Sequence, residues 1–201
     1  MQLLYRRFEF TYRIDTSRFT IGDCAAAHRA ENRSKNRNAM VVPPDASRPY
    51  LASFQSNDHT DYVNAVFVDG YRRADEFICT EWPMLDTMPD FWSMVYDHDI
   101  KTVVVLNHQR PSGKFPQFWP DNTSSGGGHK RSFGPVFCVE HESGKDHEGG
   151  RFRSFELKLT KHDVAPHRLK ALSGNPLISL VDHSPIIADP RDLGCAEEAL
   201  S

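Results

Sequence analysis

Four cysteines are the residues of this chain best suited to nucleophilic chemistry, and none has the neighbours that such chemistry requires. Cleavage of a phosphate ester by a thiolate needs a cysteine of low pKa and an arginine on one loop, whose backbone N–H groups surround the phosphate. Cys24 is followed by Ala-Ala-Ala-His-Arg, with no glycine to let the loop close. Cys79 lies in a predicted strand, Cys138 precedes acidic residues, and Cys195 stands six residues before the last residue. We therefore predict that no cysteine of this chain is catalytic.

Ten histidines raise the question of a metal site. Cys138, His141 and His147 carry side chains that zinc accepts, but their spacing matches no common structural site and a fourth ligand is lacking. Residues 124–128 (SSGGG) are rich in glycine, yet they lack the Gly-Lys-Ser/Thr ending of a phosphate-binding loop. The sequence predicts exposed surface loops here, with no metal and no cofactor.

Size and composition favour a single soluble domain. The chain has 201 residues, of which 39% are hydrophobic, enough for one core. A net charge of -3 gives no electrostatic reason to expect binding to nucleic acid or to an anionic membrane. Basic residues gather only between Arg29 and Arg37, where Glu31 interrupts them, so a solvated loop is favoured over a phosphate-binding patch. Isolated cysteines, the lack of a signal peptide and the lack of an apolar run of about 18 residues predict a cytoplasmic protein without membrane contact.

Local patterns predict the elements of the first half of the chain. Residues 21–30 (IGDCAAAHRA) predict a short helix with Asp23 near its start. Pro43 and Pro44 exclude a helix, so residues 35–44 are expected to form a loop. Residues 62–68 and 76–80 are rich in β-branched and aromatic side chains and are separated by the turn signal Asp69-Gly70, which together predict a hairpin.

A helix and a buried strand are expected next. In residues 84–97, apolar side chains recur at helical spacing at Phe91, Met94 and Val95, and Asp86 or Thr87 can cap the helix. Residues 101–106 (KTVVVL) form a continuous apolar run, typical of a strand covered on both faces. This order of elements predicts an α/β domain, with a twisted mixed sheet flanked by helices.

The last third of the chain has weaker signals. Residues 133–139 predict a strand, and the alternating residues 152–159 (FRSFELKL) predict its hairpin partner. We predict no element beyond Asp163, because prolines at 176, 185 and 190 interrupt the rest of the chain. An irregular C-terminal tail, docked loosely or not at all, is expected from Asn175 onward.

Several short motifs stand in a fixed order along the chain. They comprise Lys35, Asn36, Arg37 and Asn38; Asp61, Tyr62, Asn64, Ala65, Gly70 and Tyr71; Thr80 and Pro83; Asp90, Phe91, Trp92 and Met94; and Gln117, Phe118, Trp119 and Pro120. In this order they resemble the first half of a protein tyrosine phosphatase domain of the receptor type, from about Phe19 to Asp163. Several blocks in one order are far more specific than any single short pattern.

The resemblance implies roles for these residues. Lys35 to Asn38 correspond to a remnant of the loop that binds the substrate, where the family places an aromatic ring that stacks on phosphotyrosine. That position is Asn38 here, and Met40 stands where the family has an anchoring aspartate. The remaining motif residues are implied to be mainly structural, and Glu81 and Trp82 replace the central pair of a Thr-Gln-Gly-Pro block.

The stretch KNRNAMVVP resembles the membrane-distal second domain of receptor phosphatases of the gamma and zeta type. Such domains commonly have little or no activity, and act as regulatory or docking modules. The resemblance therefore implies an inactive domain on the cytoplasmic side of the plasma membrane, with a phosphatase domain or a signalling protein as partner. Trp119, Pro120 and Asp121 spell the family's general-acid loop but fall in an earlier block, so we interpret Asp121 as an ordinary turn residue.

The resemblance also divides the chain and leaves alternatives open. It predicts an N-terminal helical or linker segment over 1–30, a partial phosphatase-like domain over 31–163 and an unmatched tail over 164–201. The family's nucleophile loop, Cys followed by five residues and Arg, is absent from the sequence. One alternative is that the chain is a fragment of a longer, active receptor phosphatase. Another is an unrelated binding module.

Overall fold

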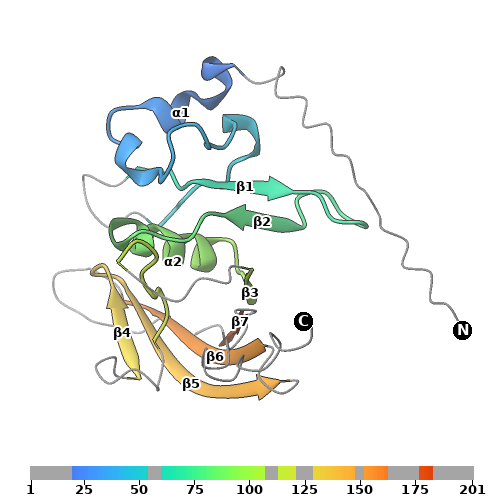
Figure 1. Ribbon diagram of the computed structural model, residues 1–201, viewed down its shortest axis with the longest axis vertical. Helices are drawn as coiled ribbons and strands as arrows, with labels where there is room; N and C mark the ends of the chain where they lie inside the picture. The colour runs from blue at the N-terminus through green and yellow to red at the C-terminus, as the bar shows by residue number, and fades with distance from the viewer. Residues whose placement is uncertain are drawn as a thin grey trace, which may run out of the picture.

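The computed structural model describes residues 20–53, 60–106, 113–120, 129–147, 152–162 and 177–182. These residues form a helical N-terminal region, a two-stranded hairpin, one longer helix and a five-stranded sheet, stacked in that order in Figure 1. The predicted α/β class with a twisted mixed sheet is confirmed. No helix among the described residues is long and apolar enough to cross a bilayer.

Short helices build the N-terminal region. A 3-10 helix, Ile21–Cys24, leads directly into α1, Ala25–His28. The Asp23 carboxylate accepts hydrogen bonds from the main-chain N–H (2.7 Å) and the hydroxyl (2.8 Å) of Thr20, which closes the first turn. Further 3-10 turns, Arg33–Lys35 and Asp45–Ser47, follow along the chain. The helix expected near Asp23 is thus confirmed, and residues 36–44 form the expected loop.

The predicted hairpin is present. Strand β1, Ala65–Val68, pairs antiparallel with β2, Phe77–Thr80, so that Ala65 lies opposite Thr80. In the connection between them, Gly70 donates its N–H to the carbonyl of Arg73 at 2.8 Å. A Cβ on Gly70 would lie 1.7 Å from the carboxylate of Glu76, so the close approach of the two residues requires glycine.

Helix α2, Met88–Asp97, follows a 3-10 turn, Leu85–Thr87. Thr87 is the N-cap residue, and its hydroxyl accepts a 2.9 Å hydrogen bond from the main-chain N–H of Met84. The apolar side chains of α2 are buried, as the spacing predicted: Met88, Phe91, Trp92, Met94 and Val95. They pack toward the large sheet, where Trp92 meets Phe133 with 5.6 Å between ring centroids.

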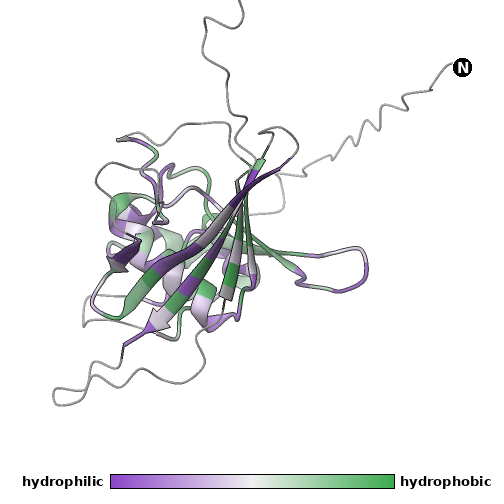
Figure 2. Ribbon diagram, turned by 90° about the horizontal axis from the view of Figure 1, so that it is seen from below, coloured by the Kyte–Doolittle hydropathy of each residue, from purple (hydrophilic) through white to green (hydrophobic). Residues whose placement is uncertain are grey.

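The large sheet has the strand order β3-β7-β6-β5-β4. Its strands are β3, Thr102–Val105; β4, Lys130–Phe133; β5, Phe137–His147; β6, Phe152–Lys161; and β7, Leu177–Asp182. Only β3 and β7 pair in parallel, so the sheet is mixed. Figure 2 shows its twist and the alternation of hydrophobic and hydrophilic residues along the strands. Leu157 and Leu159 of β6 are fully buried on the core side.

Two strand predictions are corrected by the structure. Residues 133–139 do not form one strand, because the chain turns after Phe133 and Gly134 takes a left-handed φ of 66°. Strand β3 is not covered on both faces by the described residues: Val104 is 49% exposed, although Val105 is buried. Among the described strands, β3 pairs only with β7, which leaves it at the edge of the sheet.

Strand β7 was not predicted. Leu177–Asp182 lies between β3 and β6 and pairs with both, and Ile178 and Leu180 have no exposed surface. The expectation that no element follows Asp163, and that residues from Asn175 onward dock loosely, is therefore wrong for these six residues. The short run LISLV carries no local signal that separates a strand from a loop between prolines, and its partners are far away in the sequence. The rest of the expected tail, and residues 1–19, lie outside the described residues.

Candidate functional site

Lys35 points into the fold, where it forms a buried ion pair. Its Nζ lies 2.9 Å from Oδ2 of Asp90, with 13% and 6% of the two side chains exposed. The same ammonium donates a 3.3 Å hydrogen bond to the carbonyl of Tyr62. Lys35 therefore joins the predicted substrate loop to α2 and to the segment before β1. This pair should matter for stability, because loss of one partner would leave the other charge buried.

Asn36 and Tyr62 form a second link between the same segments. The Tyr62 hydroxyl donates a 2.5 Å hydrogen bond to Oδ1 of Asn36, while Nδ2 of Asn36 donates to the carbonyls of Ala27 and Asn32. Tyr62 has no exposed surface, and this burial raises the pKa of its phenol well above the ordinary value. The phenol is thus a permanent donor, and its role is structural.

Arg37 is held at both its main chain and its side chain. Its main-chain N–H donates to Oε1 of Glu81 at 3.0 Å. Its guanidinium donates to the carbonyls of Lys114 (2.7 Å) and Trp82 (2.9 Å), and lies 4.7 Å from the ring centroid of Phe115. A guanidinium engaged in this way is directed at carbonyl groups and an aromatic face, not at an anion site.

Asn38 is the member of the predicted loop that faces solvent. Its Oδ1 accepts a 2.9 Å hydrogen bond from the main-chain N–H of Met40, which makes a local turn. Met40 is 88% exposed and Val41 is 62% exposed. The loop therefore presents an amide, a thioether and an aliphatic side chain at the surface, and these groups offer neither an aromatic face nor a charge.

The remaining motif residues lie mostly in the core or at its edge. Asp61 lies 3.0 Å from the Arg48 guanidinium, and Asn64 donates to the carbonyl of Val41 at 2.9 Å. Trp92 donates from Nε1 to the carbonyl of Phe118 at 3.0 Å. Ala65, Phe91, Trp119 and Pro120 are buried, whereas Tyr71 is fully exposed on the hairpin connection. Most of these residues are thus placed to stabilise the fold.

The chain also resembles known proteins, and the match is extensive. A family model described as "Protein-tyrosine phosphatase" matches residues 32–173. The chain belongs to the protein-tyrosine phosphatase family. The described Lys35 and Asp90 both lie within the matched range of this phosphatase domain.

Relatives of this phosphatase chain include receptor-type members of the family. It is 36% identical over 100 residues to human receptor-type tyrosine-protein phosphatase alpha, which is 49% of this chain and 12% of that protein. It is 42% identical over 100 residues to tyrosine-protein phosphatase 99A of Drosophila melanogaster, covering 50% of this chain and 8% of that protein. It is 38% identical over 100 residues to human receptor-type phosphatase zeta, covering 49% and 4%. The phosphatase chain thus spans a small part of the curated relatives that it matches.

A solved structure shares the fold. The catalytic domain of human protein tyrosine phosphatase non-receptor type 18 superposes with a TM-score of 0.64 at 22% identity, covering 80% of this chain and 52% of that one. At this identity the likeness shows the phosphatase fold, and it carries no residue roles to this chain.

The described cysteines of the phosphatase chain do not form a nucleophile site. Cys24 and Cys138 are buried, and Cys79 is exposed on β2. Burial, followed by the nearby Asp45 and Asp23 carboxylates, raises the pKa of the Cys24 thiol, which disfavours the thiolate. Cys195 and the predicted turn residue Asp121 lie outside the described residues, as does the glycine-rich segment 124–128.

The three candidate zinc ligands do not converge. Nε2 of His147 lies 2.8 Å from the hydroxyl of Ser154, and its ring stacks on Phe152. His141 is buried beside Phe155, with 5.8 Å between the ring centroids. Across the part of the chain that the structure describes, no group of three or more His, Cys, Asp or Glu side chains is arranged to hold a metal ion.

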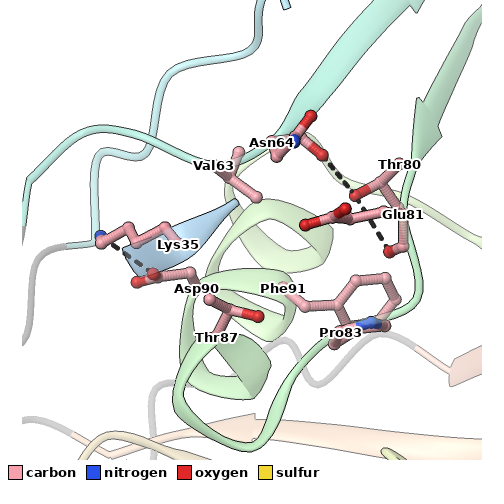
Figure 3. A pocket seen from close by; sticks show the side chains of 9 residues that line it. All are labelled: Lys35, Val63, Asn64, Thr80, Glu81, Pro83, Thr87, Asp90 and Phe91. Carbon is pink, nitrogen blue, oxygen red and sulfur yellow. Dashed lines mark hydrogen bonds and ion pairs between the residues drawn. The ribbon is translucent and has the colours of Figure 1, made fainter. Parts of the chain in front are cut away.

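Sequence reasoning missed several residues that organise the site. Arg48 is 5% exposed, and its guanidinium lies 4.2 Å from the ring centroid of Tyr50. Trp82 donates from Nε1 to the carbonyl of Pro116 at 2.6 Å and packs against Phe118. Glu81 lines a shallow pocket between β2 and α2 (Figure 3). Only the departure of Glu81 and Trp82 from the family's Thr-Gln-Gly-Pro block marked the last two in the sequence, while nothing marked Arg48.

Proposed function

We propose that this chain is a catalytically inactive phosphatase-family domain of the receptor type, which acts through contacts with other proteins. The observation that carries the proposal is a sequence fact: no cysteine of this chain is followed by five residues and an arginine. Phosphotyrosine hydrolysis in the family depends on that thiolate and that guanidinium, and no other group in the chain replaces both.

The environment of the described cysteines supports this proposal. The pKa of the Cys24 thiol is raised by burial, the opposite of what a nucleophile requires. The one arginine of the predicted substrate loop, Arg37, is committed to two carbonyls and an aromatic ring. A phosphate dianion would therefore find no prepared guanidinium at this loop.

Substrate recognition is also altered. Asn38 and Met40, both exposed, stand where the family has an aromatic ring and an aspartate. An amide cannot stack on a phosphotyrosine ring as an aromatic side chain does, and a thioether cannot accept hydrogen bonds as a carboxylate does. These changes, together with KNRNAMVVP, support the finer proposal that the domain is like the membrane-distal second domain of the gamma and zeta type.

The proposal includes a place and a partner. A receptor-type origin is consistent with a position at the cytoplasmic side of the plasma membrane, and with a phosphatase domain or a signalling protein as partner. Such contacts would use exposed groups; among the described ones, Met40, Val41 and Tyr71 are apolar or aromatic and accessible.

The test is a hydrolysis assay with 4-nitrophenyl phosphate, together with calorimetric titration of a phosphotyrosine peptide. We expect no turnover above buffer, no vanadate-sensitive component and no binding of the peptide. The variants Cys24→Ser, Cys79→Ser, Cys138→Ser and Cys195→Ser serve as matched controls. Turnover that one of these variants abolishes would overturn the proposal, because it would identify a working nucleophile.

A further inference from the structure

The pocket beside Glu81 is built from both polar and apolar groups. It is a shallow hollow of about 280 Å³, including the space at its mouth, and it lies between the end of β2 and α2. Val63 and Phe91 supply apolar walls, and Lys35 and Asp90 stand together at one side. Figure 3 shows the Glu81 carboxylate directed from β2 into this space.

The charges around the pocket do not balance. The ammonium of Lys35 and the carboxylate of Asp90 neutralise each other at 2.9 Å. Glu81 contributes a further negative charge, and its Oε1 is satisfied only by the main-chain N–H of Arg37. Within the described residues, no hydrogen bond or ion pair reaches Oε2 of Glu81. The Arg37 side chain binds the carbonyls of Lys114 and Trp82 instead. The pocket therefore offers one carboxylate oxygen beside apolar walls.

The rim of the pocket adds an exposed apolar surface. Asn64, which lines the pocket, donates from Nδ2 to the carbonyl of Val41 at 2.9 Å and so fixes the neighbouring loop. The side chains of Met40 and Val41 are 88% and 62% exposed there. Apolar groups around a charged pocket are typical of a protein contact, in which the rim packs on the partner and the pocket takes one side chain.

We propose that the Glu81 pocket binds the primary ammonium group of a lysine side chain presented by a partner protein. The ammonium would donate to Oε2 of Glu81, and the methylene groups of the lysine would lie against Val63 and Phe91. The inference deepens the proposed function, since it names the chemistry of one protein contact. Burial raises the pKa of Glu81, and a bound ammonium would favour the charged carboxylate again.

The experiment is a titration followed by two-dimensional NMR of the full chain labelled with ¹⁵N. The ligands are n-butylammonium, uncharged n-butanol, and a capped Leu-Lys-Leu peptide with and without Nε-acetylation. We expect saturable shifts at the amides of Thr80, Glu81 and Asn64 with n-butylammonium and with the free-lysine peptide only. Tighter binding of the peptide would identify a protein lysine as the ligand, and tighter binding of n-butylammonium would identify a free amine.

Matched variants localise the binding. Glu81→Gln keeps an acceptor for the Arg37 N–H but removes the charge, so we expect affinity for n-butylammonium to fall about fivefold or more. Asp86→Asn removes an exposed carboxylate of the adjacent 3-10 turn and should leave affinity unchanged. The amide spectrum of each variant reports whether it is folded.

Three results would overturn the inference. These are the absence of saturable shifts with both amines, equal binding by the Glu81→Gln variant, and an equal loss with Asp86→Asn. The outcome is separate from the proposed function, because turnover of 4-nitrophenyl phosphate is measured on the same sample. Hydrolysis with amine binding would overturn only the proposed inactivity, and lack of both would overturn only the lysine pocket.

Discussion

The Glu81 carboxylate accepts a 3.0 Å hydrogen bond from the main-chain N–H of Arg37. This bond joins the residue after β2 to a loop that lies 44 positions earlier in the chain. A carboxylate makes a charge-assisted bond at this place, where the family block has an amide. Because Glu81 is half-buried, the same change also places a negative charge in a partly desolvated position.

The stability of the domain should therefore depend on pH through Glu81. Burial raises the pKa of Glu81 above its ordinary value of 4.5, against a smaller opposite effect of the Arg37 N–H. The folded state then binds the proton more tightly than the unfolded state. Its contribution is full below 4.5, and is lost as the pH rises through the folded pKa. We expect Glu81→Gln to gain stability relative to the native chain between about pH 4 and pH 7, measured by urea unfolding. A constant difference across this range would contradict the argument.

The ion pair between Lys35 and Asp90 should contribute strongly to stability. Removal of one charge leaves the other buried, so Lys35→Met or Asp90→Asn should lower the free energy of unfolding by about 3 kcal/mol. The exposed pair Lys101 and Asp99, 58% and 75% exposed, provides the control, and Lys101→Met should change stability by less than about 0.5 kcal/mol. A double-mutant cycle at Lys35 and Asp90 with no coupling energy would show that the pair is not formed in solution.

Two buried tryptophans should respond differently to the same substitution. Trp92 Nε1 donates to the carbonyl of Phe118, whereas Trp119 Nε1 is buried with no hydrogen-bond partner among the described residues. Trp92→Phe leaves that carbonyl without its donor, and Trp119→Phe removes an unpaired donor. We expect Trp92→Phe to be more destabilising by about 1 kcal/mol or more, measured by chemical unfolding. Equal effects would mean that packing alone governs both positions.

Strand β7 should behave as part of the core. Leu180 has no exposed surface, so Leu180→Ala should lower the free energy of unfolding by about 2–5 kcal/mol. Ser179 on the same strand is half-buried and hydrogen-bonds to Glu156, so Ser179→Ala should have a much smaller effect of about 1 kcal/mol. Hydrogen exchange should also protect the amides of residues 178–181. Unprotected amides together with a neutral Leu180→Ala variant would mean that this segment lies outside the folded core.

The family, the fold class and most local elements are encoded in short stretches of sequence. The hairpin of β1 and β2, helix α2 with its Thr87 cap, and the pairing partner of β5 arise from periods, turn signals and caps that act over a few residues. The order of the motifs is enough to identify the phosphatase family. The absence of a Cys-x5-Arg segment is likewise a property of the sequence alone.

Which of these residues meet depends on the tertiary structure. The pairing of Lys35 with Asp90, of Arg37 with Glu81 and of β7 with both β3 and β6 joins segments that are far apart in the chain. No local pattern specifies such contacts, because ion pairs and sheet register depend on packing among distant segments. For the same reason the sequence could mark Lys35 to Asn38 as a loop remnant, but it could not show that three of these four residues stabilise the fold from within.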